Sequence, residues 1–294
     1  MDLSTQIIQS LIAGLTTGSI YAIVAVGFNV IFKSTDAINF AQGEWVMMGG
    51  MVAATTYAAW HLPLWMACIV GVLVVGIVGA LSQRLTIQPL ASPSPVQVTM
   101  VSIGLAICTK SLVMLVLGKT PMGYPAFSGD VPVMVAGASI QPQSFWVLGV
   151  AGVFMLLTDW FFKHTLLGKS MRATAADRDA AALVGISVKR SVTWAFLLAA
   201  LAGGLAGVII TPLTFTSYDH GTMLGFKGFS AAMLGGLGSL HGAFLGGLLL
   251  GVVEALTGNL LSSHFKDAVS FILLLLVLFL RPHGMLGKAE INKV

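Results

Sequence analysis

The stretch Lys163–Arg190, with the sequence KHTLLGKSMRATAADRDAAALVGISVKR, is a polar island between long apolar segments. It holds eight of the 26 charged residues of the chain, which has 15 Lys and Arg and 11 Asp and Glu. Such a segment must lie in water. From Met171 to Val184 it is rich in Ala and has neither Pro nor Gly, so it is predicted to form a short helix outside the membrane. A helix in that position suggests a docking surface for a soluble partner.

The composition predicts an all-α, polytopic integral membrane protein with a single transmembrane domain over residues 1–294. Hydrophobic residues make up 56% of the chain and charged residues only 9%, and the mean hydropathy is +0.93. Soluble domains carry about 25% charged residues. The 34 glycines are typical of closely packed membrane helices. Because neither a basic n-region nor a cleavage site accompanies the first apolar run, we expect the first helix to be retained.

Hydropathy predicts seven separate spans and one interrupted segment. The run 228–257 is long enough for one helix, but the sequence GGLGSLHG at 235–242 interrupts it near the middle. Two short crossings or a re-entrant pair fit this run better than a single helix, which gives eight or nine membrane segments. The other spans are expected at roughly 7–32, 38–59, 64–83, 96–117, 144–162, 191–213 and 267–281.

The distribution of basic residues predicts the orientation through the positive-inside rule. With the N-terminus outside and the run 228–257 crossing twice, the inside loops hold eleven basic residues and the outside loops three. A single crossing would instead place the basic tail outside, so we expect the N-terminus outside and the C-terminus in the cytoplasm. The inside residues are the six of the polar island with Lys33, Arg84, Arg281, Lys288 and Lys293, and the outside residues are Lys119, Lys227 and Lys266.

The connection 118–143 is the largest one expected outside the membrane. Its four prolines and several glycines make it rich in turns, and a short strand is predicted at Val131–Val135. It could receive an external binding protein, or it could only cover the helix ends. The composition leaves both alternatives open.

Two interpretations of the polar island remain open. In the first, Gly168–Ile186 is a cytoplasmic helix that inserts into a cleft of an ATPase subunit, with polar contacts at the rim and small residues for close approach. In the second, the island is a solvated connector whose basic residues only set the topology. Its length favours docking, because connections between helices usually have about 2–8 residues. The rim residues would be Arg172, Asp177, Arg178 and Asp179, and the small residues Ala173, Ala176 and Ala180.

Gly168-Lys169-Ser170 looks like the end of a phosphate-binding loop. That motif requires a Gly at position 163, where this chain has Lys. We therefore expect no Walker-type ATPase site, and any nucleotide-driven work would come from another polypeptide.

A second constellation, Asn39-Phe40-Ala41-Gln42-Gly43-Glu44, stands at the start of the second predicted span. Polar side chains there are costly unless they line water, pair with neighbours or cap the helix. Asn39, Gln42, Gly43 and Glu44 are therefore candidates for a translocation path or gate. Helix capping and hydrogen bonds between helices are the alternative, which the sequence by itself favours.

Glycines in the predicted break of the run 228–257 form a third constellation. A helix that is broken within a membrane exposes unpaired backbone groups, which only protein or a water-filled cavity can surround. The glycines are therefore candidates for a hinge, although tight packing at small-xxx-small spacing explains most of them. The hinge candidates are Gly235, Gly236, Gly238 and Gly242, and the spaced pairs are Gly242/Gly246 and Gly247/Gly251.

Three ionisable residues, Lys110, Asp159 and Glu254, lie in or near predicted spans. Asp159 and Glu254 fall near span ends, where snorkelling to the interface explains them. Lys110 is the deepest. We expect it to serve the structure or a subunit contact rather than a substrate.

Enzyme signatures are weak throughout the chain. The six histidines lack HExxH spacing, and Cys68 and Cys108 fall in apolar runs without CxxC spacing, so no metal or redox site is predicted. Gly228-Phe229-Ser230-Ala231 resembles the G-x-S motif of intramembrane serine proteases, with His241 or His264 as a conceivable base. Because a four-residue match arises by chance, we expect a protein that is not an enzyme and has no catalytic residues.

Several stretches together resemble the membrane subunits of branched-chain amino acid ABC importers, and they cover nearly the whole chain. Two residues depart from the usual pattern without weakening it, Gln42 where many relatives have His and His241 where Pro is common. The stretches are Thr17–Ala22 followed by Ile38–Glu44, Arg172–Asp177 continuing to Ile186, Lys227–Ser239 followed by Gly242-Ala243, and Lys266–Phe271 followed by Arg281–Gly287.

The resemblance implies the first of two membrane subunits of a high-affinity importer in a bacterial inner membrane. The implied partners are a second related permease, two cytoplasmic ATP-binding subunits, an external substrate-binding protein and membrane lipid, with no cofactor and no nucleic acid. Gly168–Gly185 would be the coupling segment. The implied substrates are leucine, isoleucine and valine, with urea, short amides or other amino acids as alternatives. A rival of another class is a channel or carrier that needs no ATP.

Overall fold

The computed structural model describes residues 3–90, 94–135, 137–260, 266–281 and 283–287. Within these ranges the chain is mostly helical, with one π-helical turn (η1) and one two-stranded antiparallel sheet. His264, Lys288 and Lys293 lie outside the described residues. The elements are α1 (Leu3–Thr35), α2 (Gln42–Trp60), α3 (Leu64–Ser82), η1 (Gln83–Ile87), α4 (Pro95–Leu117), β1 (Val133–Val135), β2 (Ala138–Ile140), α5 (Pro142–His164), α6 (Leu166–Ala176), α7 (Arg178–Leu183), α8 (Val188–Thr214), α9 (His220–Gly235), α10 (Leu240–Leu260) and α11 (Lys266–Leu280).

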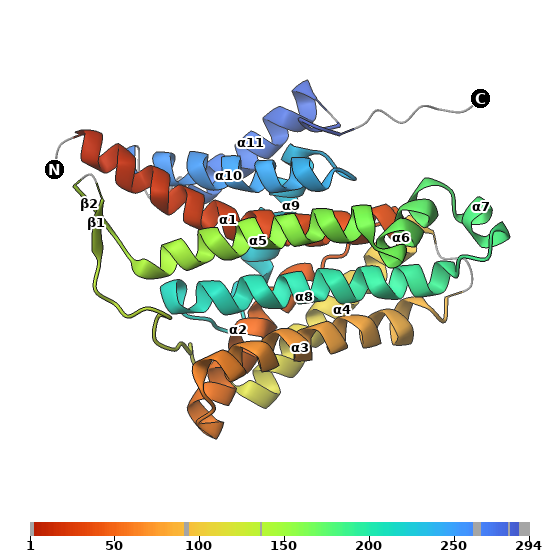
Figure 1. Ribbon diagram of the computed structural model, residues 1–294, viewed down its shortest axis with the longest axis horizontal. Coiled ribbons are helices and arrows are strands. Elements are labelled where there is room, and N and C mark those ends of the chain that lie inside the picture. Colours follow the sequence, from red (N-terminus) through yellow and green to blue (C-terminus); the bar gives the residue numbers. More distant parts are fainter. Residues whose placement is uncertain (1–2, 91–93, 136, 261–265, 282, 288–294) are drawn as a thin grey trace.

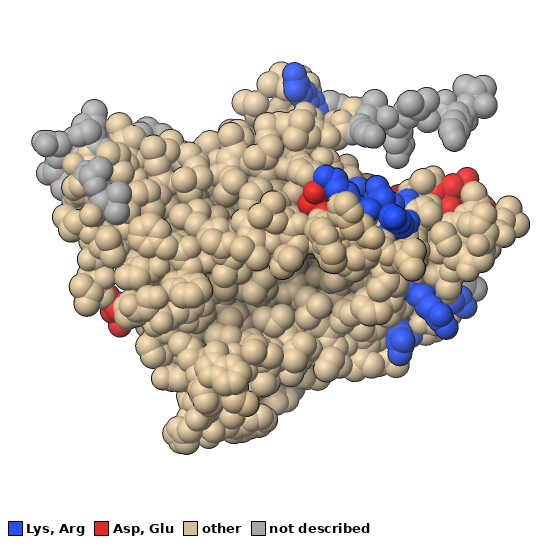
Figure 2. Space-filling view, viewed as in Figure 1, with Lys and Arg blue, Asp and Glu red and all other residues tan. Residues whose placement is uncertain are grey.

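The long helices lie roughly side by side, and the bundle has two chemically different ends (Figure 1). Lys and Arg side chains gather at the end that carries α6 and α7, which we call the basic end (Figure 2). The β1–β2 hairpin lies at the opposite end, which we call the hairpin end, and α1 begins beside it. The charge pattern of the sequence thus separates along the long axis of the bundle.

Six helices in the described part of the chain are long and apolar enough to cross a membrane. This finding confirms the predicted all-α, polytopic membrane protein. The apolar residues of several of these helices face outward, as in Leu115 of α4, which is 80% exposed. Such surfaces are stable against lipid and unfavourable against water. The six spans are Thr5–Thr35, Leu64–Ile87, Pro95–Leu117, Pro142–His164, Val188–Thr214 and Leu240–Asn259.

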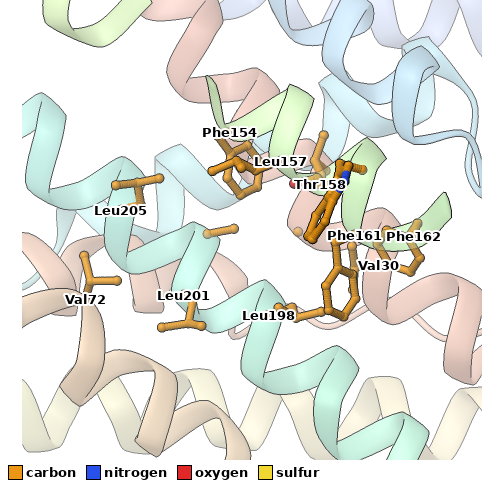
Figure 3. Close-up of a pocket in the computed structure, with 14 residues that line it drawn as sticks. Val30, Val72, Phe154, Leu157, Thr158, Phe161, Phe162, Leu198, Leu201 and Leu205 are labelled. Carbon is orange, nitrogen blue, oxygen red and sulfur yellow. The ribbon is translucent and has the colours of Figure 1, made fainter. Parts of the chain in front are cut away.

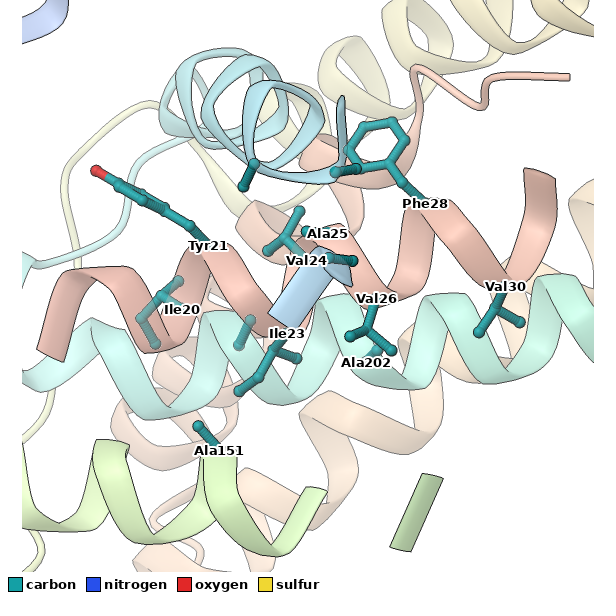
Figure 4. Close-up of a cluster of buried hydrophobic side chains, with 14 of the residues drawn as sticks. Ile20, Tyr21, Ile23, Val24, Ala25, Val26, Phe28, Val30, Ala151 and Ala202 are labelled. Carbon is teal, nitrogen blue, oxygen red and sulfur yellow. The ribbon is translucent and has the colours of Figure 1, made fainter. Parts of the chain in front are cut away.

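Helix α1 forms the centre of the bundle. In its most apolar part 72% of the residues are buried, against 11% in α4. Figure 4 shows its side chains radiating from the helix, with Ile23 near Ala151 of α5 and Val26 near Ala202 of α8. Because α1 is surrounded by protein, a polar residue on it meets other helices rather than lipid.

Glycines bring α1 and α10 into direct backbone contact. A Cβ atom on Gly251 would overlap the backbone of Gly18, and one on Gly247 would overlap the backbone of Ala22. The spaced pair Gly247/Gly251 therefore serves tight packing, as the small-xxx-small pattern predicts. Gly246 plays the same part between α10 and α9, since its Cβ atom would overlap the Ala231 carbonyl oxygen.

Three boundaries differ from the sequence predictions. Helix α2 begins at Gln42 rather than near residue 38, because residues 36–41 are not helical. Helix α9 begins at His220 rather than at residue 228, so the placement of Lys227 in an outside loop was wrong. The strand expected at Val131–Val135 is present as β1 but begins at Val133, and it pairs antiparallel with β2.

We expect Gly251→Ala to lower the free energy of unfolding by about 1–3 kcal/mol, because the added methyl group forces α1 and α10 apart. Gly149→Ala on α5 is the matched control. Its Cβ atom would meet nothing within 4 Å, and the change should gain up to about 1 kcal/mol of helix propensity. Thermal unfolding of both variants in detergent would test this, and equal transitions would contradict the packing account.

Candidate functional site

Residues 36–41, between α1 and α2, are a non-helical segment inside the bundle. Ala37, Asn39 and Ala41 are fully buried. Ser102 of α4 supplies the missing backbone partners, because its hydroxyl accepts the Phe40 N–H at 3.0 Å and lies 3.3 Å from the Ile38 carbonyl oxygen. Ser102 is seven residues from the start of α4, about 10 Å along that helix. Irregular backbone at such a depth is stable only where protein or a cavity surrounds it.

The predicted path residues contact three different elements. Gln42 donates from Nε2 to the Ala199 carbonyl of α8 at 2.9 Å, and Glu44 accepts on Oε1 from the Thr222 hydroxyl of α9 at 2.9 Å. Asn39 caps its own loop, accepting the Ala41 N–H on Oδ1 at 3.2 Å. The interhelical hydrogen bonds that the sequence favoured are thus present.

In each of these three side chains, one polar atom has no hydrogen-bond partner among the described residues. Asn39 Nδ2, Gln42 Oε1 and Glu44 Oε2 are buried and have no hydrogen-bond partner among the described residues. Gly43 lies between them and packs directly on the backbone of Gly221 and Gly225 in α9. Buried polar atoms without a partner are rare, so this cluster calls for a functional explanation.

A pocket of about 470 Å³ opens beside Glu44, between α2, α4 and α9. It has two charged residues, Glu44 and Lys110, and an otherwise largely apolar wall. The outer wall is exposed at the surface of the chain, since Ile107 is 63% exposed. The lining residues are Phe40, Glu44, Ile103, Ala106, Ile107, Lys110, Thr222, Gly225 and Phe226.

A second pocket, of about 370 Å³, is almost wholly apolar (Figure 3). Leu198, Leu201 and Leu205 of α8 face Phe154 and Leu157 of α5 across it. It contains no charged residue, so it offers apolar contact without the polar groups that fix the orientation of a polar ligand.

The predicted break in the run 228–257 lies between α9 and α10, and Asn29 of α1 closes it. Asn29 donates from Nδ2 to the Ser239 carbonyl at 3.0 Å and lies 3.3 Å from the Gly236 carbonyl. Its Oδ1 accepts the Gly238 N–H at 3.0 Å. Asn29 is fully buried, and sequence reasoning missed it although it is an isolated amide in an apolar span.

The four hinge candidates divide into two groups. Gly236 and Gly238 have φ values of 107° and 82°, conformations that favour glycine, and they make the turn. Gly235 and Gly242 lie on either side, and their backbones pack directly on each other. The C-terminal segment completes the structure, because the N–H groups of residues 285 and 286 donate to the last carbonyls of α9, at 2.9 and 3.0 Å.

An ion cluster lies between α9, α10 and α11. Lys227 Nζ is 2.8 Å from Glu254 Oε1 and 2.7 Å from Asp267 Oδ1. Glu254 also pairs with Lys266 at 3.2 Å, and its side chain is completely buried. The snorkelling explanation was therefore wrong for Glu254, whose charge is neutralised inside the protein.

Asp159 and Lys110 have different surroundings. Asp159 lies at the basic end, where it pairs with Lys163 at 2.7 Å and lies 3.3 Å from His241 Nε2. Lys110 lies in the membrane part of α4 with its Nζ 5.9 Å from the centre of the Tyr218 ring. Ser230 is buried on α9, and within the described residues no hydrogen bond joins it to a histidine.

The polar island contains two short helices rather than the single helix expected over Gly168–Ile186. The helix is interrupted at Asp177. The Oδ1 atom of Asp177 accepts hydrogen bonds from the N–H groups of Asp179 and Ala180, both at 3.0 Å. Asp177 is therefore the N-cap of α7. Arg178 ties this helix to the end of α1 through Asp36, at 3.0 Å.

The other coupling candidates lie along the same two helices. Gly168 packs against the Phe161 carbonyl, and Gly185 adopts a φ of 85° after α7. Arg172 and Ala176 are exposed and Ala173 is half-buried. Sequence reasoning missed the exposed apolar tip of α7, where Leu183 is 88% and Val184 is 75% exposed.

The sequence is similar to one family over most of its length. Residues 10–278 match the family described as "Branched-chain amino acid transport system / permease component". The high-affinity branched-chain amino acid transport system permease protein LivH of Escherichia coli is 34% identical, over 98% of this chain and 97% of that protein. LivH of Salmonella typhimurium is 33% identical with the same coverage. BraD of Pseudomonas aeruginosa, a permease protein of the same description, is 33% identical over 98% of both chains.

We expect Asn29→Ala to lower the free energy of unfolding by about 2 kcal/mol, because it removes three hydrogen bonds from the α9–α10 break. Ser34→Ala on the same helix is the matched control. Its buried hydroxyl bonds to the Val30 carbonyl of its own helix, so the loss should stay within about 0.5 kcal/mol. Thermal unfolding of both variants in detergent tests this prediction. If Asn29→Ala unfolded at the same temperature as Ser34→Ala, this role of Asn29 would be contradicted.

Proposed function

The chain belongs to the family of branched-chain amino acid transport permease components, and we propose that it works in an ATP-driven importer. In this proposal it forms the translocation path together with a second, related permease. Its substrates are leucine, isoleucine and valine. The observation that carries the proposal is the match along nearly the whole chain to permeases of that description, which favours these substrates over urea and short amides.

We propose nine membrane segments, formed by α1–α5 and α8–α11. An odd number places the two termini on opposite sides of the membrane. Lys and Arg side chains gather at the basic end, beside α6 and α7 of the polar island (Figure 2), which supports a cytoplasmic location for this end through the positive-inside rule. The N-terminus then faces the outside of a bacterial inner membrane, where the 118–143 loop is available to an external substrate-binding protein.

We further propose that α6 and α7 are the surface on which a cytoplasmic ATP-binding subunit docks. The exposed tip formed by Leu183 and Val184 supports this, because apolar side chains on a helix outside the membrane gain from burial by a partner. Arg178 of α7 pairs at 3.0 Å with Asp36, an exposed residue directly after α1, so α7 lies beside the entry to the non-helical segment at residues 36–41.

Reconstitution tests the function as a whole. The chain, a second permease, two ATP-binding subunits and a substrate-binding protein in proteoliposomes should take up leucine only when ATP is supplied. Urea and acetamide should not accumulate. Uptake of leucine by this chain alone, without nucleotide, would instead identify a self-sufficient carrier.

Substitutions on α7 test the docking surface. Leu183→Asp should reduce copurification of the ATP-binding subunits and substrate-stimulated ATP hydrolysis about tenfold, because a charge replaces the exposed apolar tip. Val131→Asp is the matched control, because Val131 is an apolar residue that is 81% exposed at the hairpin end, and it should leave copurification of the ATP-binding subunits unchanged. Asp177→Ala should lower the free energy of unfolding by about 1 kcal/mol, because α7 loses its N-cap. Asp177→Asn should keep that stability, because Asn can accept the same hydrogen bonds. Normal assembly and ATP hydrolysis in Leu183→Asp, and in Arg172→Ala combined with Asp177→Ala, would contradict docking here.

A further inference from the structure

We propose that the pocket between α2, α4 and α9 is a subsite for the zwitterion of an aliphatic amino acid. Glu44 accepts the α-ammonium group and Lys110 pairs with the α-carboxylate, while the apolar wall holds the side chain. The inference rests on the proposed function and adds to it the residues that contact the substrate.

Glu44 has the free acceptor that an ammonium group needs. Its side chain is buried, with the residue only 3% exposed, and Thr222 occupies Oε1 while Oε2 has no partner among the described residues. No ion pair within 4.0 Å involves Glu44 in the described part of the chain. A carboxylate in apolar surroundings is strongly stabilised by a cation that enters beside it.

Lys110 supplies the opposite charge on the facing helix. It lines the same pocket from α4, and within the described residues it too forms no ion pair within 4.0 Å. The pocket therefore contains one acid and one base that do not contact each other. A zwitterion carries both complementary charges a short distance apart and can bridge them, whereas a singly charged molecule leaves one of them unpaired.

The rest of the pocket suits an aliphatic side chain. Phe40, Ile103, Ile107 and Phe226 provide apolar contact, and the volume of about 470 Å³ falls in the range of small-molecule sites. Phe40 belongs to the non-helical segment that enters the bundle. Broken helices of this kind recur at substrate sites of membrane transporters, because irregular backbone is stable where it lines a cavity.

Glu254, the other buried carboxylate in the part of the chain that the structure describes, has partners on both oxygens. Glu254 receives Lys227 and Lys266 on Oε1 and the Ser270 hydroxyl on Oε2, at 3.3 Å for the last. Tyr21 donates to the same carboxylate at 3.3 Å. Lys227 and Lys266 thus neutralise Glu254, and among the described residues Glu44 is the buried carboxylate with an unpaired oxygen for a ligand cation.

The experiment uses the complete importer in proteoliposomes, with a photoreactive leucine analogue that carries a diazirine in its side chain. Labelling should map to the peptides with Ile103, Ile107 or Phe226, and excess leucine should prevent it. Glu44→Gln and Lys110→Gln should each reduce this labelling and ATP-driven leucine uptake about tenfold or more, the loss expected for one charge-assisted contact. Glu44→Asp, which keeps the charge, should retain part of both.

A charge-neutralising change outside the pocket, the 118–143 loop and the polar island is the matched control. Arg84→Gln alters an exposed residue of η1 and should label and transport normally. Copurification of all subunits shows that each variant has folded and assembled. If the unaltered importer takes up leucine while Glu44→Gln and Lys110→Gln label and transport normally, the subsite is overturned and the proposed function stands. Labelling that excess leucine does not prevent would also overturn it, because the analogue would then react without occupying a leucine site. An unaltered importer that takes up no leucine overturns the proposed function itself.

Discussion

Backbone N–H and C=O groups inside an apolar bundle need hydrogen-bond partners, and this requirement shapes the interior of the protein. The bundle is interrupted at residues 36–41 and again between α9 and α10. At each interruption one side chain of another helix supplies partners to the freed backbone, Ser102 at the first and Asn29 at the second. Without these two side chains, unpaired backbone groups would be buried at both places.

Helix α9 contacts both interruptions, the first through the rings of Phe40 and Phe229, whose centres are 5.9 Å apart, and the second where α9 ends. Near its start, α9 packs on Gly43 and binds Glu44 through Thr222. At its end it meets the turn that Asn29 holds closed. Between these points Lys227 joins it to α10 and α11. A sixteen-residue helix therefore connects the pocket beside Glu44 with the basic end of the bundle.

The order and approximate bounds of the helices could be predicted from the sequence, because long apolar segments and their breaks carry that information. The start of α9 could not. A hydropathy scale treats Lys227 as unfavourable in a membrane helix. In the folded chain Glu254, 27 positions away, neutralises its charge, and a local window does not contain that partner. The division of the polar island had a local signal, since Asp177 precedes Asp179 and Ala180 in the manner of a helix cap. The Ala-rich composition of residues 171–184, without Pro or Gly, instead predicted one continuous helix.

The candidate site likewise depends on contacts between residues that are far apart in the sequence. The sequence marks Asn39, Gln42 and Glu44 as unusual at the start of a span, and it marks Lys110 as deep in another. That Glu44 and Lys110 line one pocket depends on the packing of α2 against α4 and α9, which no local pattern contains. The role of Asn29 likewise depends on α1 passing beside a turn more than 200 residues further along the chain.

The hydrogen bonds from residues 285 and 286 to the final carbonyls of α9 have a consequence for biosynthesis. Translation proceeds from the N-terminus, so α9 emerges from the ribosome some fifty residues before the segment that caps it. The carbonyl oxygens of Leu234 and Gly235 therefore need other hydrogen-bond partners until residues 285 and 286 have been synthesised and have reached them.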